Sequence, residues 1–407
     1  MAFSPRERPF DVMSPLSTLR RFRPGVLAAA FATYVVFLGI GVVDPVLPTI
    51  AEAMGASHTM VELLFTSYIL VMALAMLVSG PIATRLGDKR TMTLGVAFVV
   101  VFAGLCGLAP SIDALALLRG GWGLGNALFT TTVLAIIVGL SRGDTASSIT
   151  LFEGALGMGI ASGPLIGGFL GSLSWRYPFF AAAALAAVGL CITVFTVESP
   201  ETAESEQSVR DVLGALRHPA VIGNALVGLL YTFAFFVVLA YTPLTLDLGA
   251  IGLGLVFFGW GAFLALGSVV VSSRLVSRYG AVTTMAGTLT AFVVILAAMG
   301  VAGPSARIAL VVVSGLCCGI SNAVLTTLAI EVSPFSRSIS SASYNCLRWS
   351  GAAVAPVLSG YLGGQFGSAT PFFLGAAVVA LAVVGLLTSG DTLRTAVAAP
   401  EDAVGAD

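Results

Sequence analysis

Charged side chains are scarce in this sequence. Only 10% of its 407 residues are Asp, Glu, Lys or Arg, whereas about 25% is usual for a soluble domain. Hydrophobic residues make up 57% of the chain, and another 47 residues are glycine. So few charges cannot cover so apolar a surface in water, which excludes a soluble enzyme and indicates a protein of the lipid bilayer.

Lysine and histidine are nearly absent. Lys89 is the only lysine and lies in Gly-Asp-Lys-Arg, so the chain has no Gly-Lys-Ser/Thr loop to hold nucleotide phosphates. His58 and His218 lie in predicted loops, which argues against a metal-hydrolase site or a histidine proton relay. The net charge of −1 argues against nucleic acid as a partner. We expect neither a cofactor nor a metal ion.

Twelve apolar runs follow one another along the chain, each long enough to cross a bilayer as a helix. They lie at about residues 26–50, 60–83, 92–110, 114–140, 146–173, 178–197, 219–245, 250–273, 281–302, 305–331, 338–364 and 370–389. The pattern predicts an all-α membrane protein with twelve transmembrane helices. The first run follows a cluster of arginines, but it is too long for a signal peptide, so we expect a retained helix.

Basic residues are distributed unevenly among the predicted loops. If both termini are cytoplasmic, fifteen of the 19 basic residues lie on the cytoplasmic side, and only Arg176 and Arg307 lie outside. Basic residues favour cytoplasmic loops in membrane proteins. We therefore expect a multi-pass protein of the inner membrane with both termini in the cytoplasm.

The two halves of the sequence are alike. Thr84-Arg85-Leu86-Gly87 corresponds to Ser277-Arg278-Tyr279-Gly280, and Pro164 corresponds to Pro356, at offsets of 193 and 192. Duplicated units of this kind place a substrate site between the halves near the membrane midplane. The expected organisation is an N-terminal tail (1–25), a six-helix bundle (26–197), a linker (198–218), a second and pseudo-symmetric six-helix bundle (219–389) and a C-terminal tail (390–407).

The segment Gly80-Pro81-Ile82-Ala83-Thr84-Arg85-Leu86-Gly87-Asp88-Lys89-Arg90 resembles motif A of the major facilitator superfamily, and the resemblance extends over essentially the whole chain. It implies the major facilitator fold. The family usually has an aspartate where this chain has Thr84 and a basic residue where it has Asp88. The resemblance implies that this loop helps to hold the outward-open state, with gating residues Gly80, Arg85, Gly87, Asp88, Lys89 and Arg90.

A glycine-rich segment of the fifth run, 154–168, is similar to motif C, the signature of the antiporter branch of the family. Its small residues let another helix approach closely, and Pro164 removes one backbone hydrogen bond and allows a kink. We expect this segment to form the surface over which the two halves rock. The gating residues implied here are Gly159, Gly163, Pro164, Gly167 and Gly168.

Asp44 is the candidate for proton coupling, because a carboxylate in hydrocarbon costs about 2.5–3.5 kcal/mol and is seldom present without a function. The segment 39–48 resembles the helix 1 motif of drug:proton antiporters. Arg119, in a segment that looks like motif B, lies at a similar depth, so a reciprocal pair or coupling through water is expected. Asp44 is expected to be the only carboxylate well inside a cavity-lining helix. Glu153 is either a second protonation site or a residue that reaches the inner interface.

Polar and aromatic residues on the predicted cavity-lining helices are candidates for binding a substrate. Arg348 lies about ten residues into its helix and needs a carboxylate, a carbonyl or an anionic substrate as partner. Any single one of the others also fits an ordinary helix contact. The candidates are Tyr34, Phe37, Asn126, Asn224, Tyr231, Phe235, Asn322, Thr326 and Arg348.

The resemblance implies a monomeric secondary transporter, driven by the proton gradient, that exports small organic molecules or drugs by alternating access. A proton symporter or facilitator for a nutrient or metabolite is the alternative. A membrane sensor that moves no solute would need a soluble partner domain, and the predicted tails are short. An intramembrane enzyme would need a nucleophile motif or a histidine cluster, and the sequence has neither.

Overall fold

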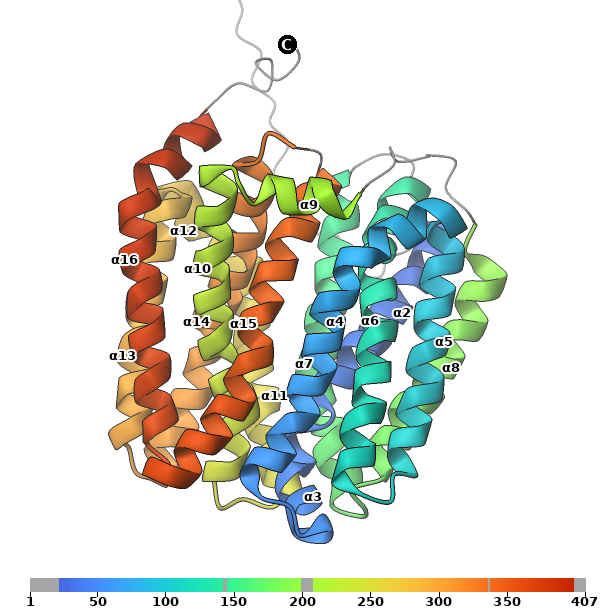
Figure 1. Cartoon of the computed structure of the whole chain (residues 1–407), viewed down its shortest axis with the longest axis vertical. Helices are drawn as coiled ribbons and strands as arrows, with labels where there is room; N and C mark the ends of the chain where they lie inside the picture. The colour runs from blue at the N-terminus through green and yellow to red at the C-terminus, as the bar shows by residue number, and fades with distance from the viewer. Residues whose placement is uncertain (1–21, 142–144, 199–207, 336, 399–407) are drawn as a thin grey trace, which may run out of the picture.

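The computed structural model describes residues 22–141, 145–198, 208–335 and 337–398, which are almost entirely helical. Two groups of helices lie side by side, and the short helix α9 (Val209–Ala215) crosses over them at one end (Figure 1). We call this end the α9 end. The opposite end carries the short helix α3 (Leu47–Met54) and is called the α3 end (Figure 1).

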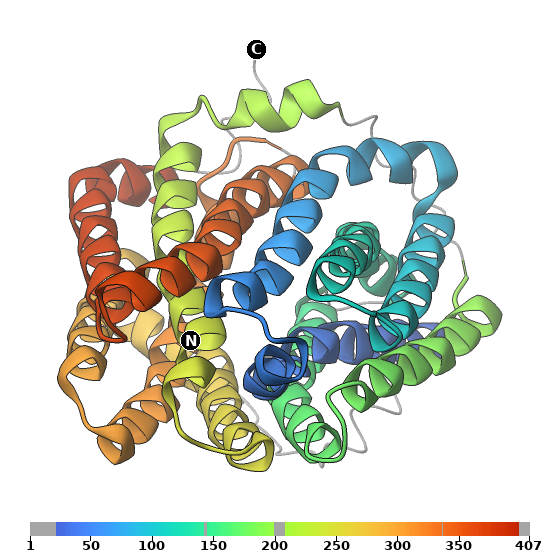
Figure 2. The same ribbon diagram turned by 60° about the horizontal axis from the view of Figure 1, so that its bottom comes forward.

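The helices divide between the groups in chain order (Figure 2). The N-terminal group contains α2 (Pro24–Gly41), α3, α4 (His58–Leu86), α5 (Asp88–Gly107), α6 (Ile112–Leu140), α7 (Thr145–Gly171) and α8 (Tyr177–Thr196). The C-terminal group contains α10 (Pro219–Phe236), α11 (Ala250–Leu266), α12 (Ser272–Tyr279), α13 (Ala281–Val301), α14 (Pro304–Glu331), α15 (Arg337–Phe366) and α16 (Thr370–Ala398).

Several helices contain irregular turns. The first predicted run is not one regular helix, because a 3-10 turn, η1 (Asp44–Val46), separates α2 from α3. Pro45 and Pro48 have no backbone N–H to donate, which accounts for the break. A π-helical segment, η2 (Val237–Tyr241), and a 3-10 turn, η3 (Thr242–Thr245), follow α10. A second π-helical segment, η4 (Gly267–Val271), joins α11 to α12.

Eleven helical segments in the described part of the chain are long and apolar enough to cross a membrane. They match the predicted runs except for the run at 338–364. That run forms α15, which has 30 residues and is long enough to span a bilayer, but it contains Arg348 and several serines. The fold is therefore that of a multi-pass helical membrane protein.

Equivalent helix contacts recur in the two groups. Gly123 on α6 packs against the backbone carbonyl of Tyr68 on α4, and Gly315 on α14 packs in the same way against that of Trp260 on α11. The two glycines are 192 positions apart in the sequence. This is the offset at which Pro164 corresponds to Pro356, and both prolines lie inside helices, α7 and α15.

Helix α7 is packed between α2 and α11, so it joins the two groups. A Cβ atom on Gly163 would lie 2.7 Å from the carbonyl oxygen of Leu38 on α2, and Gly159 and Gly167 also face the α2 backbone. Gly168 faces Ala250 on α11, in the C-terminal group. Three of the predicted gating glycines therefore pack within their own group, and Gly168 packs across the boundary.

We predict that alanine has opposite effects at two glycines of α7. Gly163→Ala should destabilise the protein by about 1–3 kcal/mol, because its Cβ would collide with the α2 backbone. Gly154→Ala, where a Cβ would have nothing within 4 Å, should stabilise the helix by about 0.5–1 kcal/mol. Thermal unfolding of the detergent-solubilised variants measures both. Equal effects at the two positions would contradict the close packing of α7 on α2.

Candidate functional site

Asp44 lies inside the N-terminal group, at the point where the first helix breaks. Its backbone carbonyl accepts a hydrogen bond from the N–H of Leu47, which closes the 3-10 turn η1. Its side chain is fully buried, and neither carboxylate oxygen accepts a hydrogen bond from another residue in the described part of the chain. The predicted proton-coupling residue is thus enclosed by protein.

A second buried carboxyl group lies beside it. Glu62 on α4 is fully buried, and its two side-chain oxygens have no hydrogen-bond partner in the part of the chain that the structure describes. It is close enough to Asp44 for the two groups to interact electrostatically. Asp44 is therefore not the only fully buried carboxyl group among the described residues. The apolar run that begins at about residue 60 places Glu62 at the membrane surface, but α4 begins at His58 with Ser57 as its cap, so Glu62 lies on the second turn.

Arg119 on α6 supplies the positive charge of this cluster. It is fully buried, and its Nε donates to the carbonyl oxygen of Leu64 at 3.3 Å. Its two terminal nitrogens have no hydrogen-bond partner among the described residues. Its Cζ lies 4.4 Å from the ring centroid of Tyr68 and 4.9 Å from that of Trp122, within the range of cation–π attraction. Asp44 and Arg119 interact electrostatically, but the predicted pair is not a direct hydrogen bond.

The charges of these three side chains do not balance when all are ionised. The guanidinium of Arg119 keeps its proton in proteins and can offset one carboxylate. A second ionised carboxylate would leave a net negative charge buried inside the protein, at a cost of several kcal/mol. We define Asp44, Glu62 and Arg119 as the acid cluster. Its buried arrangement favours a state in which at least one carboxyl group holds a proton.

The two groups of helices meet closely at the α3 end, around the acid cluster. Thr66 on α4 donates from its hydroxyl to the carbonyl oxygen of Ala353 on α15 at 2.7 Å. The rings of Phe65 on α4 and Phe236 on α10 meet edge to face with centroids 6.3 Å apart. On the other side, a Cβ atom on Gly254 of α11 would lie 2.6 Å from the carbonyl oxygen of Pro164 on α7. The structure is therefore closed at this end.

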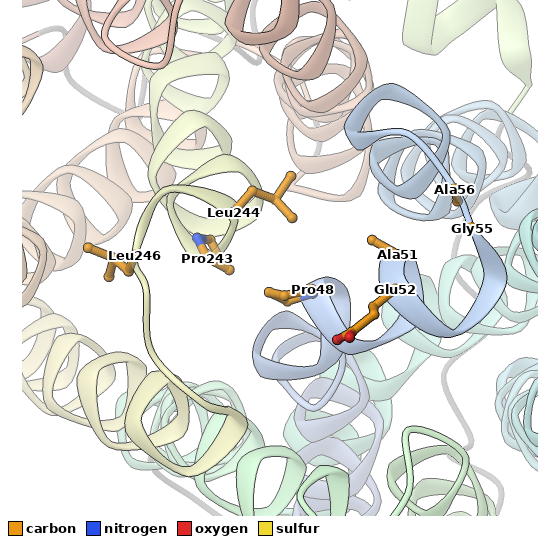
Figure 3. Close-up of a pocket in the computed structure, with 8 residues that line it drawn as sticks. All are labelled: Pro48, Ala51, Glu52, Gly55, Ala56, Pro243, Leu244 and Leu246. Atoms are coloured by element: carbon orange, nitrogen blue, oxygen red, sulfur yellow. The ribbon is translucent and has the colours of Figure 1, made fainter.

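A shallow depression marks the outside of this closed end (Figure 3). It has a volume of about 350 Å³ and lies where α3 approaches η3. Glu52 on α3 is exposed there, and its carboxylate is the charged group among the lining side chains (Figure 3). The lining residues are Pro48, Ala51, Glu52, Gly55, Ala56, Pro243, Leu244 and Leu246.

A second polar cluster lies in the C-terminal group. The guanidinium of Arg348 on α15 donates to the Asn322 amide oxygen at 2.7 Å, and the hydroxyl of Tyr231 on α10 donates to the same oxygen at 3.1 Å. Arg348 and Asn322 are partly exposed, and the Nε of Arg348 has no partner. The predicted partner of Arg348 is thus an amide carbonyl.

The other predicted binding residues differ in how far their side chains are exposed. Tyr34 and Thr326 are partly exposed, and the hydroxyl of Ser162 on α7 donates to the Tyr34 hydroxyl at 3.1 Å. The remaining four are buried: Phe37, Asn126, Asn224 and Phe235. The Asn126 amide donates to the Tyr68 hydroxyl, and the Asn224 amide donates to the Leu325 carbonyl oxygen at 3.1 Å, so both take part in helix packing.

The predicted gating loop lies at the α9 end, and its residues join α4 to α5. Gly87 has φ +85°, a conformation that favours glycine, and Asp88 begins α5, where a carboxylate suits the positive end of the helix dipole. Arg85 and Arg90 are exposed, whereas Lys89 and Gly80 are partly exposed. Glu153 lies on α7, but its side chain is outside the described part of the structure.

A family model and individual relatives of this chain indicate the same protein family. The family model described as Major Facilitator Superfamily matches residues 29–348. The chain is 44% identical over 364 residues to the multidrug efflux protein YfmO of Bacillus subtilis (strain 168). The aligned region covers 89% of this chain and 92% of YfmO. It is 24% identical over 280 residues to the quinolone resistance protein NorA of Staphylococcus aureus (strain MRSA252), over 67% of this chain and 72% of NorA.

Solved structures show the same fold. The nucleoside transporter NupG matches with a TM-score of 0.72 at 14% identity, over 89% of this chain and 99% of its own. A bacterial homolog of the human lysosomal transporter Spinster, in an inward-facing and occupied conformation, matches with a TM-score of 0.71 at 16% identity, over 91% of this chain and 96% of its own.

Removing the cation of the acid cluster should destabilise the protein in a way that depends on Asp44. We predict that Arg119→Gln lowers the free energy of unfolding by about 3 kcal/mol, because it leaves the buried carboxyl groups without a counterion. In an Asp44→Asn background the same change should cost at least about 1 kcal/mol less. Thermal unfolding of the single and double variants measures this coupling. Additive effects would show that the two charges do not stabilise each other.

Proposed function

Because this chain belongs to the major facilitator superfamily and crosses the membrane several times, we propose that it is a proton-driven exporter of small organic molecules or drugs. The observation that carries the proposal is the 44% identity to a multidrug efflux protein over nearly the full length of both chains. The buried acid cluster supports proton coupling, because carboxyl groups inside membrane proteins mark ion and proton pathways. The chain is not an enzyme.

The distribution of charge supports an orientation for the transporter. Arg85, Arg90, Arg274 and Arg278 are exposed, and all four flank the helix connections at the α9 end. Since basic loops favour the cytoplasm, the α9 end and both termini face the cytoplasm, and the α3 end faces outward. In this assignment the protein lies in the inner membrane as a monomer, and the structure corresponds to a state closed to the outside.

Alternating access in this proposal is a rocking of residues 26–197 against residues 219–389. The recurring glycine contacts within each group support rigid units, since each glycine lets two helices of one group pack backbone to backbone. Contacts that must break lie at the α3 end, where α4 meets α15 and α7 meets α11. Helix α9 remains as the connection between the two units.

Asp44 carries the transported proton in this mechanism. Arg119, held by the Leu64 carbonyl and the surrounding rings, stabilises the carboxylate once the proton has left for the cytoplasmic side. Partly exposed side chains from both groups, Tyr34, Asn322, Thr326 and Arg348, are the best placed of the predicted residues to contact a substrate. Arg348 favours substrates with hydrogen-bond acceptors or negative charge.

Replacing Asp44 should separate binding from coupling. Asp44→Asn mimics the protonated carboxyl group, so we predict that a pH gradient no longer drives accumulation of a probe in proteoliposomes. Binding of norfloxacin, a zwitterion without net charge, should be largely unchanged, and ethidium, a lipophilic cation, should bind more weakly. The assay measures binding of both probes, and their accumulation with and without a pH gradient.

Asp113→Asn is the matched control, because Asp113 is exposed in the first turn of α6 and should retain wild-type coupling. Gradient-driven accumulation by Asp44→Asn at the wild-type rate would remove Asp44 from the mechanism. If the wild type itself moved no probe in response to the gradient, the proposed function would fail.

The basic loop between α4 and α5 should influence which side is open. We predict that Arg85→Ala combined with Arg90→Ala favours opening at the α9 end, because it removes positive charges proposed to hold the two groups together there. Thr84→Asp, which restores the usual acid of motif A, should shift the equilibrium the other way. The measurement is the ratio of labelling of single cysteines at the two ends, with Arg210→Ala on α9 as the control. An unchanged ratio in the double variant would rule out this gating role.

A further inference from the structure

Glu62 lies on the face of α4 that contacts the other group of helices. Glu62, Phe65 and Thr66 are separated by three and four positions, so they share one side of the helix. Phe65 packs against Phe236 of α10, and Thr66 donates a hydrogen bond to the Ala353 carbonyl oxygen of α15. Glu62 is one turn closer to the α3 end than these contacts. Its carboxyl group is therefore buried at the boundary between the two groups.

The groups around Glu62 come from both sides of this boundary. Asp44 on η1 interacts with it electrostatically from within the N-terminal group, and Tyr241 on η2 does so from the C-terminal group. Arg119 lies beyond Asp44, and Arg307 is within electrostatic range of Tyr241. Helix α15 contributes Ala353 and the ring of Trp349 near this face, with no ionisable contact to Glu62 among the described residues.

The burial of Glu62 depends on how close the two groups are. Helix α4 belongs to one group, whereas η2 and α15 belong to the other, and all three meet at the α3 end. Moving them apart would expose the Glu62 carboxyl group to water at the α3 end. An ionised carboxylate is stable when hydrated, but it costs several kcal/mol when it is enclosed without a partner. The neutral acid carries no such cost of burial.

We propose that Glu62 senses protons at the α3 end and controls its closure. This inference rests on the proposed function and deepens it. When the α3 end is open, the Glu62 carboxylate takes a proton from water on that side, and the neutral acid allows the groups to close. When the end opens again, the proton returns to the same side. Asp44 carries the transported proton, and Arg119 compensates its charge while Glu62 stays neutral.

This assignment predicts different behaviour for the two acids of the cluster. Protonation of Glu62 favours closure, so a rise in pH should open the α3 end. Glu62→Gln, which cannot ionise, should keep the end closed at every pH and should therefore lose export. Asp44→Asn should lose coupling but keep the pH-dependent opening.

The experiment measures the distance between spin labels on Ala53→Cys and Asp247→Cys. Both positions are exposed at the α3 end, one in each group, and the five native cysteines are first replaced. Purified full-length protein is measured from about pH 4 to about pH 9, a range that begins near the pKa of about 4.3 of a glutamate side chain in water. We expect the wild type to shift from a short to a long distance as the pH rises, and Glu62→Gln to show only the short distance.

Two variants keep the result interpretable. Glu52→Gln removes an exposed carboxylate at the same end and should behave like the wild type. Glu62→Asp keeps an ionisable group and should retain the shift, so a folding defect of Glu62→Gln would not be mistaken for the effect. A wild-type pH shift in folded Glu62→Gln would overturn the proposal. That outcome is independent of the proposed function, which fails only if the wild type shows no gradient-driven export of ethidium or norfloxacin.

Discussion

The burial of two carboxyl groups beside a single guanidinium is the constraint on which the closed structure depends. Asp44 and Glu62 are both enclosed, and among the described residues no other side chain or backbone group donates a hydrogen bond to their side-chain oxygens. Arg119 can balance only one of them. Closing the α3 end and holding a proton are therefore energetically linked. A movement that hydrates the acid cluster stabilises the ionised carboxylates, so the bound proton can leave.

Close helix packing makes this enclosure complete. On one side, small residues of α7 allow α2 and α11 to approach its backbone, so the break at η1 is covered by both groups of helices. On the other side, aromatic rings and the hydrogen bond from Thr66 to Ala353 join α4 to the C-terminal group. Since the contacts of α7 with α11 and of α4 with α15 cross the boundary between the groups, a rigid rocking motion would open them together and expose both acids at once.

Much of the architecture could be predicted because lipid imposes strong patterns on a sequence. The apolar runs predict the helices. Because charged residues are rare within these runs, Asp44, Arg119 and Arg348 stand out as candidate functional residues. Glu62 was missed because it lies near the start of an apolar run, where a carboxylate normally reaches water. Its spacing with Phe65 and Thr66 was the available signal. The partners of Arg119 could not be predicted, since aromatic rings and a backbone carbonyl hold it in place of a carboxylate hydrogen bond.

We propose that the acid cluster holds a proton on Glu62 whenever the α3 end is closed. Infrared difference spectroscopy tests this on protein with isotopically labelled glutamate, cross-linked closed through cysteines at positions 53 and 247. We expect a carbonyl stretch of a protonated glutamic acid at neutral pH that shifts with the label and disappears in Glu62→Gln. A closed protein that shows only carboxylate bands at neutral pH would contradict it.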